Sequence, residues 1–284
     1  MILHQALQSI TQTLRRAGIA DASFEAELLL GHVLGISKTQ LYTEPERNLT
    51  SAETEHLRHF VRRRRDHEPT AYILGHCEFY GIDFYIDNHT FIPRPETELL
   101  VEKAVELVHH ISHQTRPITI ADIGTGCGAI AVSLAIALPQ AKIYATDISA
   151  SALRVAEINC QRHAVNRQVA LLQGNLLEPL PQPVDMIVAN LPYIKSCEFG
   201  DLSPEIRKAE PTIALAGGED GLDKIQQILE QMPGKLNCGA YFLLEIGQGQ
   251  GGRVTSLING YFPKASMELI SDLGGIERVV KVAL

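Results

Sequence analysis

The spacing of apolar residues divides this chain into a helical first part and a second part in which strands and helices alternate. Across residues 1–75 the apolar positions recur three or four residues apart, as at Leu3, Leu7, Ile10 and Leu14. This spacing is the period of an amphipathic helix. The first part is therefore predicted to be a bundle of short helices.

Two further stretches support the helical prediction for the first part. In DASFEAELLLGHVLG the residues Phe24, Leu28 and Leu29 fall on one helical face. Thr50 and Glu53 form a capping box ahead of SAETEHLRHFVRRRRD, because each can satisfy a free backbone N–H at the start of that helix. None of these helices carries a catalytic motif of its own.

The spacing of polar and apolar residues changes after the helical part. Residues 78–90, EFYGIDFYIDNHT, alternate in polarity and are rich in aromatic residues, with Gly81 near the middle. This pattern predicts a β-hairpin. The stretch FIPRPETELLVEKAVELVHH follows, and it predicts a proline-stiffened approach and then a helix from about Glu96.

The second part of the chain shows the pattern of an α/β domain. Apolar runs alternate with helical runs, which is typical of a parallel sheet that is covered on both faces by helices. The predicted strands are 118–123, 142–147, 168–173, 184–189, 240–246, 264–270 and 276–282. The predicted helices are 129–138, 150–163, 220–232 and 250–260.

Composition narrows the class of protein. The 284 residues are 45% hydrophobic and 20% charged, with a formal net charge of −8 and a pI of about 5.8. An acidic chain is a poor candidate for wrapping duplex nucleic acid, which requires an excess of Lys and Arg. The five cysteines are scattered, as expected for reduced thiols. We see neither a signal peptide nor a membrane span, so we expect a cytoplasmic protein without membrane contact.

A glycine-rich loop follows the first strand of the α/β part. Gly124, Gly126 and Gly128 stand between an apolar strand and a helix, and the next strand ends in Asp147. Glycines there let the backbone approach a ligand, and the carboxylate can accept both hydroxyls of a ribose. The loop also satisfies the dinucleotide fingerprint through Ala129. It therefore predicts a ligand that contains adenosine, and a nicotinamide-dependent oxidoreductase stays an alternative.

A second polar group follows the fourth predicted strand, in the turn Asn190-Leu191-Pro192-Tyr193. Ligands of open α/β sheets lie beyond the carboxyl ends of the strands, so this turn shares an edge with the glycine loop. The side-chain oxygen of Asn190 and the carbonyl of Leu191 can each accept one N–H of a planar NH₂ group. Pro192 restricts the backbone before it, and Tyr193 offers a flat face for an amide or a base.

This arrangement favours methyl transfer from S-adenosylmethionine to an NH₂ nitrogen. The lone pair of such a nitrogen is delocalised, and two acceptors on its protons orient the lone pair and favour the positive charge that grows on nitrogen. No metal and no strong base is required. Glutamine of a ribosomal protein and adenine N6 of a nucleic acid stay open as substrates. A non-catalytic module that holds an Asn or Gln side chain also stays open.

Several stretches together make the chain resemble the HemK-type, or PrmC, release factor glutamine methyltransferases over nearly its whole length. They are AYILGHCEFYGIDFYID, FIPRPETELLVE, DIGTGCGAIAVSLA, NLPYI, EPTIALAGGEDGLD and LLEIGQGQG. The Arg94–Glu98 stretch and the glycine-rich turn at 217–221 are more diagnostic than the glycine loop, which all such methyltransferases share.

The resemblance implies a helical substrate-recognition domain at 1–75, a β-hairpin linker at 76–93 and a Rossmann-like, seven-stranded class I methyltransferase domain at 94–284. It implies that S-adenosylmethionine is the methyl donor, with S-adenosylhomocysteine as product. The implied substrate is the glutamine of the Gly-Gly-Gln motif in class I peptide chain release factors, with no direct need for nucleic acid.

Site residues follow from the resemblance by position. Asn190, Leu191, Pro192 and Tyr193 would form the catalytic and substrate-binding turn. The cofactor-binding residues would be Gly124, Thr125, Gly126, Cys127, Gly128, Asp147, Asn175, Leu176 and Asn190. Two positions depart from the family pattern. Leu191 stands where the family usually has the first proline, and the resulting Asn-Leu-Pro-Tyr sequence also resembles the motif of ribosomal RNA adenine dimethylases. Leu176 stands where some members have an aromatic residue.

Four other features are interpreted as structural. The arginine run 62–65 is predicted to be a solvated helix face. The stretch His109–His113 lacks partners with metal-ligand spacing, so no metal site is predicted. Cys127 is interpreted as a small residue that packs near the cofactor, and Glu245 as a structural residue at a strand end.

Overall fold

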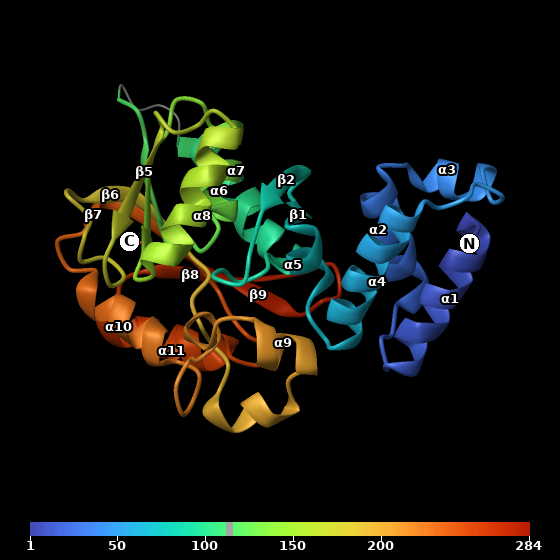
Figure 1. The fold of residues 1–284 in the computed structure, drawn as a ribbon. Coiled ribbons are helices and arrows are strands. Elements are labelled where there is room, and N and C mark those ends of the chain that lie inside the picture. Colours follow the sequence, from blue (N-terminus) through green and yellow to red (C-terminus); the bar gives the residue numbers. More distant parts are fainter. Residues whose placement is uncertain (112–115) are drawn as a thin grey trace. The chain divides into compact units, whose positions relative to one another are not determined.

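The computed structural model describes residues 1–111 and 116–284 and divides the chain into two compact units. Unit 1 contains Met1–His76 and the later segment Ser203–Ala209. Unit 2 contains Cys77–Leu202 and Glu210–Leu284. Figure 1 shows that unit 1 is helical, whereas unit 2 is built around a sheet. No helix in the described part of the chain is long and apolar enough to cross a membrane.

Unit 1 contains six helices, and five of them, α1 to α5, enclose one apolar core. Its helices are α1 Leu3–Arg16, α2 Ala22–Leu34, α3 Lys38–Thr43, α4 Ser51–Arg65, α5 Thr70–Leu74 and α9 Pro204–Ala209. The predicted period of α1 is confirmed, because its buried positions are Leu3, Ala6, Ile10 and Leu14. The capping box of α4 is confirmed as well: the Glu53 backbone N–H donates to Thr50 Oγ1 at 3.1 Å.

The predicted face of α2 is wrong. Phe24 and Leu28 are exposed, and Leu29 is buried with Ala22 and Ala26. The helix is apolar around most of its circumference, so periodicity alone does not choose a face. The contacts of α2 with α1 and α4 choose it instead.

The predicted solvation of the arginine run is also wrong in part. The side chain of Arg64 is buried, and its guanidinium pairs with Glu25 of α2 and with Glu205 of α9, the latter at 2.5 Å. Arg63 binds Glu68 through two hydrogen bonds. Because buried charges require partners, these carboxylates explain how arginines of α4 face inward.

Unit 2 contains a hairpin and a sheet of seven strands. The strands are β1 His76–Phe79, whose first residue belongs to unit 1, and β2 Ile82–Tyr85 in the hairpin, then β3 Thr119–Ile123, β4 Lys142–Asp147, β5 Val169–Gln173, β6 Val184–Ala189, β7 Leu236–Glu245, β8 Ser266–Ser271 and β9 Glu277–Ala283. The predicted hairpin is confirmed, with Tyr80 and Gly81 in its turn. Both have positive φ, as a two-residue hairpin turn of type I′ requires.

The helices of unit 2 cover both faces of the seven-stranded sheet. They are η1 Pro95–Thr97, α6 Glu98–Ile111, α7 Ala129–Ala137, α8 Ala150–Arg162, η2 Ser196–Asp201, η3 Thr212–Ala214, α10 Asp223–Gln231 and α11 Gly251–Tyr261. In Figure 1, α6, α7 and α8 lie on one face and α10 and α11 on the other. The stretch 196–214, which contains η2, α9 and η3, was not assigned from the sequence. His113 of the predicted helix end lies outside the described residues.

The strand order is β5-β4-β3-β6-β7-β9-β8. The strands from β5 to β7 are parallel, whereas β9 is antiparallel to both β7 and β8. The prediction of a purely parallel sheet is therefore wrong at one edge. Only a tight turn near Asp272 joins β8 to β9, and a tight turn permits antiparallel pairing alone. Placing β3 beside β4 and β6 brings the ends of these three strands to one edge, where the predicted ligand residues follow.

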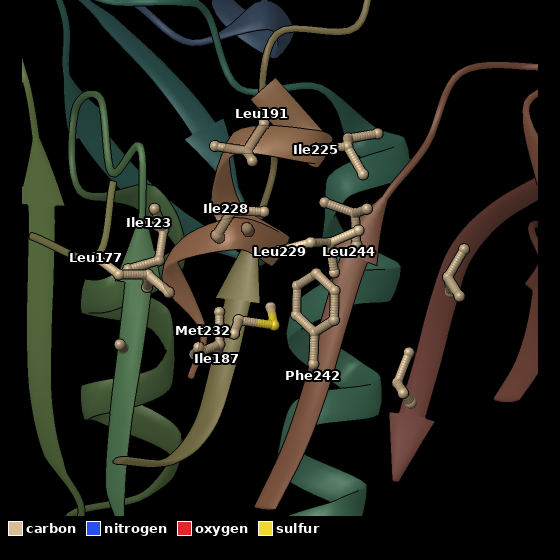
Figure 2. Packing of buried hydrophobic residues seen from close by; sticks show 14 of the residues in the cluster. Ile123, Leu177, Ile187, Leu191, Ile225, Ile228, Leu229, Met232, Phe242 and Leu244 are labelled. Carbon is tan, nitrogen blue, oxygen red and sulfur yellow. The ribbon is translucent and has the colours of Figure 1, made fainter. Parts of the chain in front are cut away.

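The core of unit 2 packs α10 onto this sheet. Figure 2 shows Ile225, Ile228, Leu229 and Met232 facing strand residues that include Phe242. All five are less than 2% exposed, so this contact is a dry apolar interface. The predicted helix at 220–232 begins only at residue 223, because the glycine turn precedes it.

Candidate active site

The glycine loop leaves β3 and bends sharply into α7. Gly124, Gly126 and Gly128 all have positive φ, between 56° and 84°. The backbone N–H groups of Gly124 and Thr125 both donate to the carbonyl of Thr146, at 2.9 Å. A β-carbon added at Gly126 would meet no atom within 4 Å, so this part of the loop faces open space. The loop thus presents an accessible backbone beside the end of β4.

Asp147 closes the next strand and faces the glycine loop. Its Oδ2 accepts the Gly126 N–H at 2.9 Å, and its Oδ1 accepts the Ser149 N–H at 2.8 Å. These two bonds hold the carboxylate in one orientation while each oxygen keeps a further lone pair. Burial raises the pKa of Asp147, although the backbone hydrogen bonds oppose that effect. The geometry suits a carboxylate that accepts the hydroxyls of a ribose.

The other two residues of the loop lie against the protein. Thr125 Oγ1 donates to Asp122 Oδ2 at 2.6 Å, beneath the loop. The thiol of Cys127 is buried, and burial raises its pKa above the ordinary value, so it is not a thiolate nucleophile. At Gly128 an added β-carbon would lie 3.2 Å from the β-carbon of Ala156, which shows that the third glycine permits close packing of α7 on α8.

The residues predicted to lie near the adenine follow β5. Leu176 has a φ of 53°, which is an uncommon conformation for a residue with a β-carbon. Its carbonyl accepts a hydrogen bond from Thr146 Oγ1 at 2.9 Å. Asn175 donates from its side chain to Glu178 at 3.1 Å. Thr146 therefore ties this segment to the glycine loop, through its hydroxyl on one side and its carbonyl on the other.

The Asn-Leu-Pro-Tyr turn lies against the glycine loop. A β-carbon added at Gly124 would lie 3.4 Å from Leu191 Cδ2 and 3.8 Å from the Asn190 carbonyl oxygen. Leu191 is 3% exposed, and Figure 2 shows its side chain near Ile225 of α10. Its side chain thus anchors the turn in the core of unit 2. The structure brings together the two motifs that the sequence placed on one sheet edge.

The side chain of Asn190 has a defined partner. Its Nδ2 donates to Thr97 Oγ1 at 3.0 Å. Thr97 belongs to η1, which the FIPRPETE stretch forms, and its side chain is buried. Because the NH₂ group is engaged, Oδ1 of Asn190 is the atom available to accept a hydrogen bond from a ligand.

Tyr193 sits in a cradle of glycines. Added β-carbons at Gly217 and Gly221 would lie 2.7 Å from its Cα and 2.5 Å from its carbonyl oxygen, and one at Gly247 would lie 3.1 Å from its ring. Gln250 Nε2 donates to the Tyr193 carbonyl at 3.2 Å. At these distances a residue larger than glycine would clash with Tyr193. The glycine turn at 217–221 and the IGQGQG stretch therefore allow the backbone to pack closely around Tyr193.

Glu245 lies behind the turn at the end of β7. Tyr193 donates from its hydroxyl to Glu245 Oε1 at 3.5 Å. Burial raises the pKa of Glu245 to about 7, and hydrogen bonds from Thr97 and Tyr193 oppose that effect. Burial also raises the pKa of Tyr193 to about 12, so its hydroxyl is protonated and able to donate.

The stretches FIPRPETELLVE and EPTIALAGGEDGLD meet at an ion pair. Arg94 pairs with Glu210, whose other carboxylate oxygen accepts the Ile92 N–H at 3.4 Å. The guanidinium carbon of Arg94 also lies 4.6 Å from the centre of the Phe91 ring. These contacts hold the segment before η1 in place and thereby position Thr97 under Asn190.

The residues at this edge fit an adenosyl cofactor. Gly126 offers open space where a side chain would stand, and an oriented carboxylate, Asp147, lies beside it. Among residues 1–111 and 116–284, no group of three or more His, Cys, Asp or Glu side chains is arranged to hold a metal ion.

Three residues that hold the two motifs in place were not predicted from the sequence: Thr97, Thr146 and Gln250. Glu245 was interpreted as structural, and it accepts the Tyr193 hydroxyl. Thr97 lies in FIPRPETELLVE, whose local pattern predicts only a proline-stiffened approach and a helix. Thr146 directly precedes Asp147, and Gln250 lies in LLEIGQGQG. No local pattern distinguishes such residues, because their role depends on partners distant in the chain.

Comparison with known families matches both parts of the chain. Residues 5–75 match the family described as PrmC N-terminal domain, and residues 101–208 match the family described as Methyltransferase small domain. The release factor glutamine methyltransferase of Bradyrhizobium diazoefficiens is 37% identical over 278 residues, which cover 98% of this chain and 93% of that protein. The enzyme of the same name from Moorella thermoacetica is 38% identical over 279 residues, covering 98% and 97%.

Solved structures show the same fold. A methyltransferase from Pyrococcus furiosus superposes with a TM-score of 0.52 at 17% sequence identity, over 82% of this chain and 98% of that one. Together with the strand order, this likeness confirms the predicted Rossmann-like methyltransferase fold with helices and a hairpin ahead of it.

Proposed function

The chain belongs to the family of release factor glutamine methyltransferases, and on this premise we propose that it methylates the side-chain nitrogen (N5) of the glutamine in the Gly-Gly-Gln motif of class I peptide chain release factors. The observation that carries the proposal is the packing of the Asn-Leu-Pro-Tyr turn against the glycine loop, where a β-carbon added at Gly124 would lie 3.4 Å from Leu191 Cδ2. An NH₂ acceptor site and an adenosyl site thereby share one edge.

The chain is a methyltransferase that uses S-adenosylmethionine. We propose that the loop from Gly124 to Gly128, with Asp147 and the segment Asn175–Leu176, holds this cofactor. When bound, S-adenosylmethionine supplies a methyl group on a positively charged sulfur, and S-adenosylhomocysteine remains after transfer. Asp147 would accept the ribose hydroxyls, and its contacts with Gly126 and Ser149 keep it oriented to do so.

The turn would bind the substrate amide. Asn190 Oδ1 and the Leu191 carbonyl accept the two N–H bonds of the glutamine side chain, and the Tyr193 ring covers its plane. This arrangement holds the nitrogen lone pair in one direction and stabilises the positive charge that develops on nitrogen. Once the bond from nitrogen to the methyl carbon has formed and the bond from sulfur to that carbon has broken, the nitrogen is positively charged. Its proton is then acidic enough to pass to solvent water, so the residues of the turn need only orient the nitrogen.

Two other substrates could bind the same turn, but the named relatives favour the release factor. Adenine N6 also has a planar NH₂ group, and so does a glutamine of a ribosomal protein. The named relatives that cover 98% of this chain are release factor enzymes, which favours the release factor. A nicotinamide-dependent oxidoreductase and a non-catalytic binding module are not favoured, because the matching families are methyltransferases.

We further propose that residues 1–75 recognise the release factor. This segment matches the PrmC N-terminal domain and exposes the apolar side chains of Phe24 and Tyr42. Because release factors act in translation, we place the reaction in the cytoplasm and without a membrane partner.

Label transfer from S-adenosylmethionine tests the proposed function. The chain is incubated with labelled cofactor and, in separate reactions, with a purified release factor, ribosomal proteins, RNA and DNA. We expect label only in the release factor, and peptide mapping should place it on the Gly-Gly-Gln glutamine. A release factor with Asn in place of that glutamine serves as the matched control and should stay unlabelled. Label in RNA, DNA or a ribosomal protein instead would overturn the proposal.

A further inference from the structure

Asn159 of α8 is a buried amide that joins two segments distant from each other in the chain. Its side chain is fully buried. Its Oδ1 accepts the backbone N–H of Tyr85, the last residue of β2, at 2.8 Å, and its Nδ2 donates to the Tyr85 carbonyl at 2.8 Å. The same Nδ2 donates to the carbonyl of Cys127 in the glycine loop at 2.8 Å. The amide therefore bridges the hairpin and the glycine loop.

These bonds allow the Asn159 amide only one orientation. A side-chain amide has two N–H donors on one nitrogen and an acceptor oxygen beside it. Both donors are bonded to backbone carbonyls, and the oxygen is bonded to a backbone N–H. A flipped amide would place its NH₂ group against the N–H of Tyr85 and its oxygen against a carbonyl. Because unmade hydrogen bonds of buried groups are costly, the hairpin backbone determines which way the amide faces the loop.

The peptide unit between Cys127 and Gly128 is held at both of its polar atoms. Its carbonyl accepts from Asn159, and its N–H, which belongs to Gly128, donates to the Thr125 carbonyl at 2.8 Å. The plane of this peptide therefore cannot rotate without breaking a hydrogen bond. Asn159 thus fixes the end of the glycine loop that leads into α7, while Asp147 holds the middle of the loop.

The hairpin is attached to the C-terminal end of α8 by further contacts. Asp83 of β2 pairs with Arg162, and its carbonyl accepts a hydrogen bond from His163 Nε2 at 2.9 Å. The ring of Phe84, which is fully buried, lies 5.5 Å from the ring of His163 between their centres. These contacts fix β2 on α8, so the hairpin backbone meets the amide in one position.

We infer that Asn159 is a positioning residue through which the hairpin holds the glycine loop in the conformation that binds the adenosyl cofactor. The inference rests on the proposed function, because it takes this loop as the holder of S-adenosylmethionine. Asn159 has no exposed surface, so it acts through the Cys127 carbonyl and not by touching the cofactor. Docking of the hairpin and binding of the cofactor must then favour each other, because coupling between two equilibria is reciprocal.

Binding of the product S-adenosylhomocysteine tests the inference without turnover. Asn159→Leu keeps the approximate shape and removes every hydrogen bond of the amide. We expect its Kd for S-adenosylhomocysteine, measured by calorimetry, to rise about tenfold, the scale of one hydrogen bond. Gln168→Leu is the matched control, because Gln168 Nε2 donates to the carbonyls of Ala135 and Leu138 at the opposite end of α7. The control should lose stability and change the Kd by less than about twofold.

Amide hydrogen exchange of the unmodified chain is a second measurement, and it decides the matter if Asn159→Leu does not fold. Saturating S-adenosylhomocysteine should slow the exchange of the hairpin amides, that of Tyr85 included, by about tenfold, because the coupling is reciprocal. The amides of Gly274 and Ile276, which donate to Asp272 in the turn between β8 and β9, are the control and should exchange at the same rate. In Asn159→Leu the ligand should no longer slow the hairpin amides.

The outcomes distinguish this inference from the proposed function. If the unmodified chain binds neither S-adenosylmethionine nor S-adenosylhomocysteine, both fail. If it binds them but labels no release factor, the proposed substrate fails and the positioning role of Asn159 is still decided by the binding data. If Asn159→Leu keeps the original Kd, if Gln168→Leu raises the Kd as much, or if the ligand leaves the exchange of the hairpin amides unchanged, only the positioning role is overturned.

Discussion

Arg94 and Glu210 form an ion pair between two segments that lie 116 residues apart in the chain. The carboxylate of Glu210 is 1% exposed, whereas the guanidinium of Arg94 is 29% exposed. Arg94 precedes η1, and Glu210 precedes η3. The pair therefore joins the segment that carries Thr97 to the segment that follows the Asn-Leu-Pro-Tyr turn in the chain.

Removing the arginine should destabilise the protein. Arg94→Met removes the ion pair of a buried carboxylate, and we expect the free energy of unfolding to fall by about 2–3 kcal/mol, somewhat less than for a fully buried pair. Urea unfolding measures the change. The double variant Arg94→Met/Glu210→Met should lose less than the single variant, because the buried charge is then removed together with its arginine. Equal stability of the single variant and the unmodified chain would contradict a supporting role for this pair.

Asp147 should control the affinity for the cofactor. Asp147→Ala removes the acceptor that faces the glycine loop, so binding of S-adenosylmethionine should weaken by about 1.5–3 kcal/mol, the scale of hydrogen bonds to charged groups. Calorimetry measures this change, with Asp66→Ala, an exposed acidic residue of unit 1, as control. Tighter binding of NAD than of S-adenosylmethionine to the unmodified chain would argue against the assignment.

Asn190 should act mainly in the transfer step. Asn190→Ala removes an acceptor of the substrate N–H, and loss of one preorganised hydrogen bond costs about 10²–10³ in rate. Single-turnover methylation of a release factor measures the rate, and cofactor affinity is measured in parallel. Asn166→Ala, at an exposed position after α8, should change neither quantity. A rate for Asn190→Ala near the original would rule out the role of the turn.

Stability should depend on pH through Asp122. Full burial raises the pKa of this carboxyl from 3.8 to about 7. Between these values the folded chain holds a proton that the unfolded chain has released. The contribution of Asp122 to the free energy of unfolding is thus greatest below pH 3.8, falls as the pH rises through about 7, and stays constant above it.

Asp122→Asn tests this dependence. The amide oxygen can still accept from Thr125 and Ala131, as the carboxylate does, but the residue no longer titrates. Unfolding in urea at several pH values from about 4 to 8 should show a smaller loss of stability with rising pH than in the unmodified chain. Identical slopes for the two proteins would show that Asp122 is ionised throughout this range.

The helical unit should govern recognition of the whole release factor. Phe24 and Leu28 of α2 are 55% and 37% exposed. The double variant Phe24→Ser/Leu28→Ser should raise the KM for the intact release factor by about tenfold, the order expected when apolar contacts of an interface are lost. Activity on a short peptide with Gly-Gly-Gln should not change. Ile158→Ser on α8, which is 45% exposed, is the control. An unchanged KM for the double variant would refute the recognition role.

Much of the fold follows from local patterns in the sequence. The strands Lys142–Asp147 and Val184–Ala189 lie where the apolar runs predicted them, and the capping box starts α4 where it was predicted. These features depend on residues within a few positions of one another. The glycine loop and the Asn-Leu-Pro-Tyr turn could also be placed on one edge, because both follow parallel strands.

The edge of the sheet and the buried face of α2 were predicted less well. The reversed direction of β9 follows from a tight connection, a signal that the sequence contained near Asp272 and that apolar periodicity does not express. The choice between Phe24 and Ala26 on α2 carries no local signal, because the helix is apolar on several sides. It depends on which neighbours pack against it.

The sequence by itself determined which residues are the candidates for the chemistry: the glycines with Asp147, and the turn that begins at Asn190. Only the tertiary structure decided how that turn is held, because its partners come from distant segments. Thr97 lies 93 positions from Asn190, and Glu245 lies 52 positions from Tyr193. A hydrogen bond acts over about 3 Å whatever the separation in the chain, so such partners become visible only once the strands and helices have been packed.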